Sequence, residues 1–180
     1  MIFSEVRGSG FPIVFLHGYG ESLALWDKLT HSLSQEYQTI ALDLPGFGQS
    51  KKLTPPFSIE DIASKIHQHL IDQFSLNEYI LIGHSLGGYI ALAMAEKFSK
   101  NIKGFGLINS TSFKDSPEKI ENRTKTAEFI EKHGAQFFLR NFVPNLFMEE
   151  NRLALEPEIA FVENMGLDVS SSTLVNYMHA

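Results

Sequence analysis

The chain has 180 residues, of which 43% are hydrophobic and 20% are charged, a composition typical of a globular domain with its own core. Its net charge of −6 argues against nucleic acid and anionic membrane as partners, because both attract basic surfaces. The lack of cysteine excludes disulfides and thiolate chemistry, and the lack of a signal peptide or a membrane-length apolar run leads us to expect a cytoplasmic protein.

Strand and helix patterns alternate over the first 110 residues. Short apolar runs predict buried strands at residues 12–16, 39–42, 79–82 and 105–108. Apolar residues at helical spacing predict a helix over residues 22–33 and another that begins after Ser58, its N-cap, while Leu86 to Phe98 is apolar nearly all round. This order predicts an α/β fold with a mostly parallel sheet and helices on both faces.

The pattern becomes helical beyond residue 110. Ser116 followed by Pro117 is typical of a helix start, and Gly134 of a helix end. Helical spacing continues toward the C-terminus without a clear strand. We therefore expect residues 1–110 to form the α/β core and residues 111–180 to form a helical region.

A G-x-S-x-G motif lies between the strand at 79–82 and the helix that follows it. The motif reads Gly83-His84-Ser85-Leu86-Gly87. This strand–turn–helix context is typical of a nucleophile elbow, a sharp turn whose flanking glycines leave room for the backbone. The turn is expected to hold the Ser85 hydroxyl above the end of the sheet. The N–H of Leu86, at the positive end of the helix, is then placed to stabilise an oxyanion.

Two further segments sit at strand ends and carry a family resemblance. HGYG at residues 17–20 follows the first buried strand, and DLPGFGQS at residues 43–50 follows the next. Together with GHSLGG at residues 83–88, they resemble the α/β-hydrolase superfamily, in its serine-nucleophile, cap-containing form. The resemblance implies that Tyr19 supplies a second oxyanion donor and that residues 111–180 form a cap. Six other residues are expected to fix the shape of the two loops around the site: His17, Gly18, Gly20, Gly83, His84 and Gly87.

The resemblance implies a hydrolase that attacks an ester-type carbonyl through Ser85 and an acyl-enzyme, like a carboxylesterase. It implies no metal and no cofactor. We expect a small-molecule substrate with an apolar acyl or alcohol group, because the proposed cap is rich in phenylalanine. Most of these rings are expected in the core and a few above Ser85; they are Phe129, Phe137, Phe138, Phe142, Phe147 and Phe161.

The catalytic acid and histidine of this family follow the serine on later strands. Residues 111–180 show no apolar strand ending in an acid and no late Gly-His pair, so we expect the chain to lack those strands and to hydrolyse esters poorly by itself. The strand at 105–108 would then be a free edge, which predicts self-association. The remaining histidines are not expected to act as the base, and three of them are expected at the surface: His31, His67 and His69.

Two other interpretations remain open at this point. Gly18-x-Gly20 with Asp43 at the end of the next strand imitates a dinucleotide-binding fingerprint, although Leu23 stands where a third Gly or Ala is expected. The other interpretation is a non-catalytic binding protein on the hydrolase scaffold. Binding of a nicotinamide cofactor would favour the first, and an unreactive Ser85 would favour the second.

Overall fold

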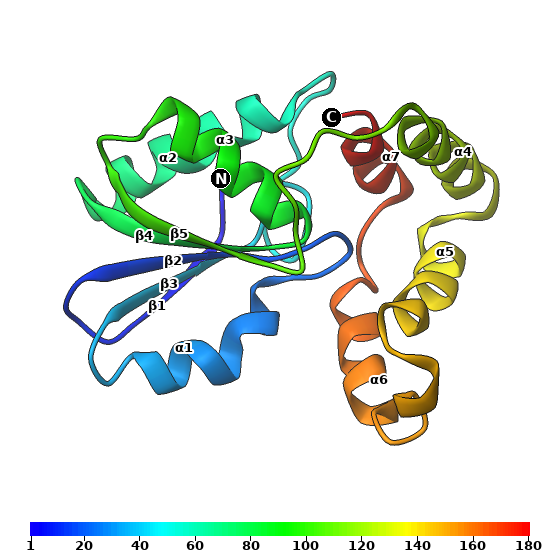
Figure 1. Ribbon diagram of the computed structural model, residues 1–180, viewed down its shortest axis with the longest axis horizontal. Coiled ribbons are helices and arrows are strands. Elements are labelled where there is room, and N and C mark those ends of the chain that lie inside the picture. The colour runs from blue at the N-terminus through cyan, green and yellow to red at the C-terminus, as the bar shows by residue number, and fades with distance from the viewer.

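The computed structural model describes residues 1–180 and contains a five-stranded sheet with helices on both faces (Figure 1). The strands are β1 (Ser4–Arg7), β2 (Pro12–Leu16), β3 (Gln38–Leu42), β4 (Tyr79–His84) and β5 (Ile102–Ile108). Their order in the sheet is β1-β3-β2-β4-β5, in which β1 is antiparallel to β3 and all other pairs are parallel. The predicted α/β fold with a mostly parallel sheet is therefore confirmed.

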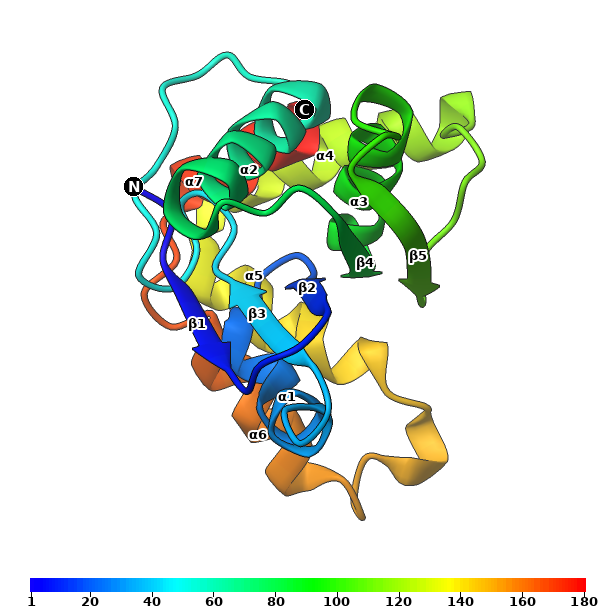
Figure 2. The same cartoon turned by 90° about the vertical axis from the view of Figure 1, so that its left-hand side faces the viewer.

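Three helices cover the sheet, two on one face and one on the other (Figures 1 and 2). The pair comprises α2 (Ile59–Phe74) and α3 (Leu86–Lys97), and the opposite face carries α1 (Asp27–Leu33). Ser58 caps α2 in a full capping box with Asp61, as its spacing indicates. The helix expected over residues 22–33 is divided, because Ser22 caps a short 3-10 helix, η1 (Leu23–Trp26), and α1 begins only after it.

The main core lies between the sheet and the α2–α3 pair. Fully buried aliphatic side chains of the central strands, such as Val14, Ile40 and Leu81, pack in one cluster with Ile66 of α2 and Ile90 of α3. Each such side chain contributes about 1.5–3 kcal/mol by leaving water. This packing fixes the carboxyl ends of β2, β3 and β4 at one edge of the sheet, where the loops of the candidate site begin.

Four α-helices follow β5 and lie beyond that edge of the sheet; we call them the helical layer (Figure 1). They are α4 (Pro117–His133), α5 (Ala135–Phe142), α6 (Glu156–Met165) and α7 (Ser171–His179), with 3-10 turns η2 (Val143–Leu146) and η3 (Glu149–Asn151) between α5 and α6. α4 packs along α7, and Ile130 and Leu174 from these two helices are fully buried in the main core cluster. No helix is both long and apolar enough to cross a membrane.

Two expectations about side-chain burial are wrong. Of the six phenylalanines expected mostly in the core, only Phe138 is buried, and Phe129, Phe137 and Phe161 are exposed. The physical reason is that the helical layer is one helix thick, so each helix has an outer face; there the rings of Phe129 and Phe137 pack against His133 in tilted pairs. Sequence spacing shows that a helix is apolar without showing which face meets the core.

His67 is buried rather than at the surface, since the residue is only 8% exposed. Its Nδ1 lies 2.9 Å from the Tyr79 hydroxyl, and its ring stacks on Phe98 with centroids 3.7 Å apart. The position lies on the inward face of α2, next to Ile66. The hydrogen bond to Tyr79 satisfies one ring nitrogen of His67 and so makes its burial possible. The polar residues near His67 in sequence give no sign of this burial.

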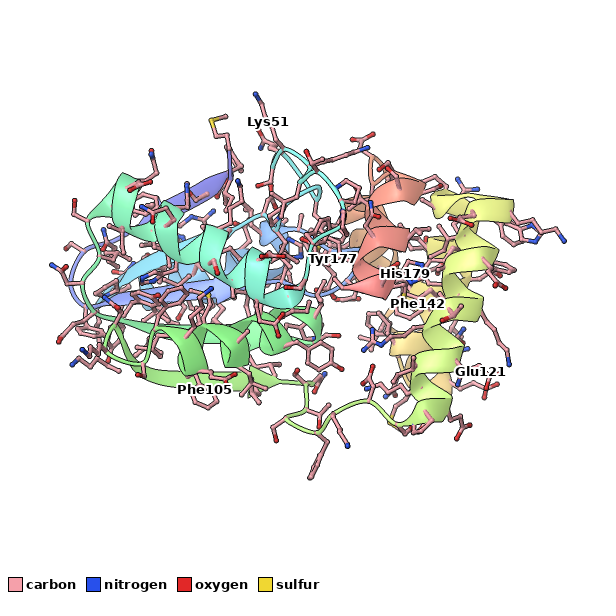
Figure 3. The ribbon with its side chains drawn as sticks, turned by 90° about the horizontal axis from the view of Figure 1, so that it is seen from above. Lys51, Phe105, Glu121, Phe142, Tyr177 and His179 are labelled. Carbon is pink, nitrogen blue, oxygen red and sulfur yellow. The ribbon has the colours of Figure 1, made fainter.

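β5 forms an open edge of the sheet. Phe105 and Ile108 are 50% and 41% exposed, and Figure 3 shows Phe105 extending outward from this strand. An apolar strand with unpaired N–H and C=O groups is a template for pairing with another chain. We therefore expect concentration-dependent self-association in light-scattering chromatography, reduced by Phe105→Lys. Phe113→Lys, at an exposed position outside the sheet, is the control, and a wild-type monomer at every concentration would contradict the expectation.

Candidate active site

Ser85 occupies the one-residue turn between β4 and α3. Its φ of 48° and ψ of −113° place it in a region that residues with a side chain seldom adopt. The backbone around it is fixed by hydrogen bonds: its N–H donates to Ile108 O at 3.0 Å, and its carbonyl accepts from Gly88 N at 2.9 Å and Ser110 Oγ at 2.8 Å. The turn is therefore strained and firmly held, as the predicted elbow requires.

Two glycines make this turn sterically possible. A Cβ added to Gly83 would lie 2.3 Å from the Gly87 carbonyl oxygen. A Cβ added to Gly87 would lie 2.3 Å from the Leu16 carbonyl oxygen at the end of β2. Both contacts are with backbone, which cannot rotate away. The G-x-S-x-G spacing therefore follows from the close approach of α3 to β4 and β2.

Ser85 lines a cavity of about 290 Å³ between the sheet and the helical layer. Tyr19 and Leu86 line the same cavity, and neither of their backbone N–H groups donates to a protein acceptor. Leu86 is the first residue of α3, where an unpaired N–H is expected. Figure 3 shows Phe142 and Tyr177 between the sheet and α4, where they line this cavity with Ser85. The structure thus brings Ser85 and two residues with unpaired backbone amides together around one cavity.

His17 is completely buried and joins the two loops beside the site. Its Nε2 accepts from Leu44 N at 2.9 Å, so Nδ1 carries the proton and donates to Gly18 O at 2.8 Å. Burial lowers the pKa of the ring below its ordinary value and keeps it neutral. With both nitrogens engaged, His17 shapes the loops and is not free to accept a proton.

Glu21 is a buried carboxylate that the sequence analysis did not single out. It is 3% exposed, and its Oε2 accepts from Gly18 N at 2.6 Å and contacts His84 Nδ1 at 2.9 Å. It ties the loop that carries Tyr19 to the residue preceding Ser85. The only local signal is an acidic residue directly after HGYG, immediately before the predicted helix. A Cβ at Gly18 would lie 2.7 Å from Glu21 Oε2 and 2.8 Å from His84 Nδ1, so a larger residue here would displace the Glu21–His84 contact.

Sequence comparison decides the family. The profile of the family described as alpha/beta hydrolase fold matches residues 12–152. The chain is an α/β-hydrolase fold protein.

This α/β-hydrolase fold protein is similar in sequence to parts of longer proteins. It is 36% identical over 131 residues to abhydrolase domain-containing protein abhd-5.2 of Caenorhabditis elegans, covering 67% of the chain and 29% of that relative. It is 28% identical over 138 residues to the rat 1-acylglycerol-3-phosphate O-acyltransferase ABHD5, covering 75% of the chain and 39% of that protein. The chain thus spans less than half the length of both.

A solved thermophilic esterase from Thermogutta terrifontis, described with malate bound, has the same architecture. It superposes with a TM-score of 0.91 at 26% identity, over 98% of the chain and 65% of the esterase. The likeness covers the sheet, the elbow region and the helical layer together. Esterases are therefore among the solved structures that this α/β-hydrolase fold protein resembles.

None of the seven histidines of the α/β-hydrolase fold protein is hydrogen-bonded to the Ser85 hydroxyl. His84 lines a second cavity with Ser85, of about 500 Å³, with its Nδ1 held by Glu21. His179 lines a neighbouring cavity of about 420 Å³ with Leu86, and Ser85 is not part of that lining. His133 stacks on Phe129 at the outer face of α4. The proton acceptor for Ser85 is thus not found among these contacts.

Asp43 accepts hydrogen bonds from the protein's own backbone on both carboxylate oxygens. Its Oδ1 accepts from Leu23 N and its Oδ2 from Gln49 N, both at 2.8 Å. Its backbone carbonyl also accepts from the hydroxyl of Ser50 at 2.6 Å. The carboxylate therefore holds the loop after β3, and at 2% exposure it is closed to the ribose contact that the dinucleotide interpretation needs.

Proposed function

We propose that this α/β-hydrolase fold protein cleaves carboxylic esters through nucleophilic attack by Ser85. One observation carries the proposal: Ser85 is held in a strained turn beside a cavity that is also lined by Tyr19 and Leu86, whose backbone N–H groups are unpaired. A hydroxyl and two fixed amide donors around one space form the arrangement that acyl transfer requires. The resemblance to the T. terrifontis esterase supports the same reaction class.

In the proposed reaction, Ser85 Oγ bonds to the carbonyl carbon of the ester while a general base takes the hydroxyl proton. The carbonyl π electrons move onto oxygen, and the N–H groups of Tyr19 and Leu86 donate to the resulting oxyanion. Collapse of this intermediate expels the alcohol, which takes up a proton, and water then releases the acid from Ser85. One such donor contributes about 2.7–4 kcal/mol to the stability of the transition state. Because no histidine is hydrogen-bonded to the Ser85 hydroxyl, we expect slow turnover by the 180-residue chain.

We propose that the helical layer acts as the cap of the site and receives an apolar part of the substrate. The cavity beside Ser85 is bordered by Phe138, Phe142, Tyr177 and Met178. Tyr19 meets this group from the core side, with its ring 6.3 Å from both Phe138 and Phe142. Such aromatic walls favour an apolar acyl or alcohol group.

Covalent labelling tests the proposed nucleophile. We expect a fluorophosphonate to modify Ser85, with the site identified by peptide mass spectrometry, and added imidazole to accelerate the modification by acting as an external base. Ser85→Ala removes the label, and Ser64→Ala, on α2 outside the site, is the matched control. A protein that stays unlabelled with imidazole present, or that is modified on other serines, would point to the non-catalytic binding alternative.

A further inference from the structure

The charged residues around the cavity beside Ser85 are all cationic. Lys119 and Arg123 of α4 line it together with Ser85, and its lining contains no aspartate or glutamate. This is unusual for a chain with 21 acidic and 15 basic residues. The cavity therefore has a local positive potential that the overall charge does not predict.

Asp115 holds both cations in place from outside this cavity. Its Oδ1 lies 2.8 Å from Lys119 Nζ, and its Oδ2 accepts from Arg123 Nε at 2.5 Å. Burial opposes ionisation of Asp115, but the hydrogen bonds from Arg123 and Lys119 prevail and lower its pKa. The group is therefore fully charged near neutral pH and keeps a net charge of +1.

The guanidinium of Arg123 is oriented and has donors to spare. Its carbon lies 5.8 Å from the centre of the Tyr89 ring, which also lines the cavity. The bond to Asp115 uses Nε, one of the five N–H donors of a guanidinium. Lys119 is positioned by the same ring, since its Nζ lies 3.3 Å from the Tyr89 hydroxyl. Two cations fixed by shared partners are preorganised for a further acceptor, which lowers the cost of binding.

From this arrangement we propose that the substrate carries an anionic oxygen group, which Arg123 and Lys119 bind while the ester carbonyl lies at Ser85. The inference rests on the proposed function and adds the substrate class: an ester with an apolar middle portion and a negatively charged end. The aromatic wall of Phe138, Phe142 and Tyr177 accommodates the apolar portion. The planar fork of Arg123 suits a carboxylate or a phosphate, to which it can donate two parallel hydrogen bonds.

Binding to the Ser85→Ala variant tests the cation pair without requiring turnover. Ligand-observed NMR titrations would compare monomethyl glutarate with its neutral partner dimethyl glutarate, and 1-butyrylglycerol 3-phosphate with 1-butyrylglycerol. We expect the charged member of at least one pair to bind roughly ten- to a hundredfold more tightly, as charge-assisted hydrogen bonds allow. The first pair reports a carboxylate ligand and the second a phosphate ligand.

Substitutions in the same background assign the preference to the two cations. Arg123→Gln and Lys119→Gln should each reduce the preference for the charged ligand at least fivefold, and Arg123→Lys should restore part of it. Arg140→Gln on α5 and Lys125→Gln on α4 are the matched controls, because Arg140 is exposed and Lys125 pairs with exposed Glu121 away from the cavity. Figure 3 shows Glu121 directed outward from α4. Thermal unfolding of each variant checks that it remains folded.

The outcomes separate this inference from the proposed function. Equal or tighter binding of the neutral ligand in both pairs would overturn the inference, as would an unchanged preference in the folded Arg123→Gln and Lys119→Gln variants. Absence of binding by all four ligands would overturn it as well. Charge-dependent binding to Ser85→Ala together with an unreactive Ser85 would retain the anion site and reject the ester hydrolase.

Discussion

Gly87→Ala should destabilise the protein by about 3 kcal/mol, at the upper end of the usual cost of overpacking, and should abolish fluorophosphonate labelling of Ser85. The added Cβ would lie 2.3 Å from the Leu16 carbonyl oxygen, so either the start of α3 or the end of β2 must move. Either movement also shifts Ser85 and Leu86. Urea unfolding followed by the fluorescence of Trp26, the single and buried tryptophan, measures the effect on stability.

Gly104→Ala is the matched control for this substitution. Gly104 lies in β5, and the nearest atom to an added Cβ is Ile80 Cγ1 at 3.9 Å, an ordinary contact. Its effect should stay within about 0.5 kcal/mol, with labelling of Ser85 retained. Equal stability of the Gly87 and Gly104 variants would show that the elbow is not packed on β2 as described.

Stability should fall as the pH decreases below about 6.5, the ordinary pKa of histidine. Burial lowers the pKa of His17 in the folded state, so below pH 6.5 the unfolded chain binds more protons than the native one. The stability that neutral His17 contributes is complete above pH 6.5 and is lost as the pH falls toward its lower folded-state pKa. The slope is at most about 1.4 kcal/mol per pH unit for one histidine that remains neutral. Burial lowers the pKa of His67 and His69 in the same direction.

Urea midpoints from pH 7.5 to pH 5 measure this dependence. His17→Gln removes one of these three titrating histidines, so it should reduce the slope of the pH profile although the variant is less stable at every pH. His31→Gln, at an exposed position of α1, should keep the wild-type slope. A wild-type midpoint that does not change across this range, or an unchanged slope in His17→Gln, would contradict the role given to burial.

The elbow could be predicted from the sequence because its determinants are local. Glycines two positions either side of Ser85, a buried strand before it and a buried helix after it specify the turn without knowledge of the rest of the chain. The sheet could be predicted for a similar reason, since continuous apolar runs separated by helices leave few alternatives. These features lie within short windows of sequence.

The roles of Glu21, Lys119 and Arg123 could not be predicted, because these side chains contact partners that are distant in sequence. Glu21 contacts His84, 63 residues away. Lys119 and Arg123 lie on a helix with many other charges, and only the packing of α4 over Ser85 separates them from exposed Lys125. The burial of His67 beside Tyr79 has the same origin. A helical pattern gives the spacing of side chains but not the surface that they meet.

Tyr19 spans the boundary between the sheet and the helices above it. Its hydroxyl donates to Leu174 O of α7 at 2.9 Å, across 155 residues of sequence, and the same residue lines the cavity beside Ser85. A shift of α7 is therefore transmitted to the loop that carries Tyr19, whose amide we propose as an oxyanion donor. If Ser85 acts as proposed, substitutions in α7 that are intended to alter selectivity should change kcat as well as KM, so selectivity and rate cannot be adjusted independently through this helix.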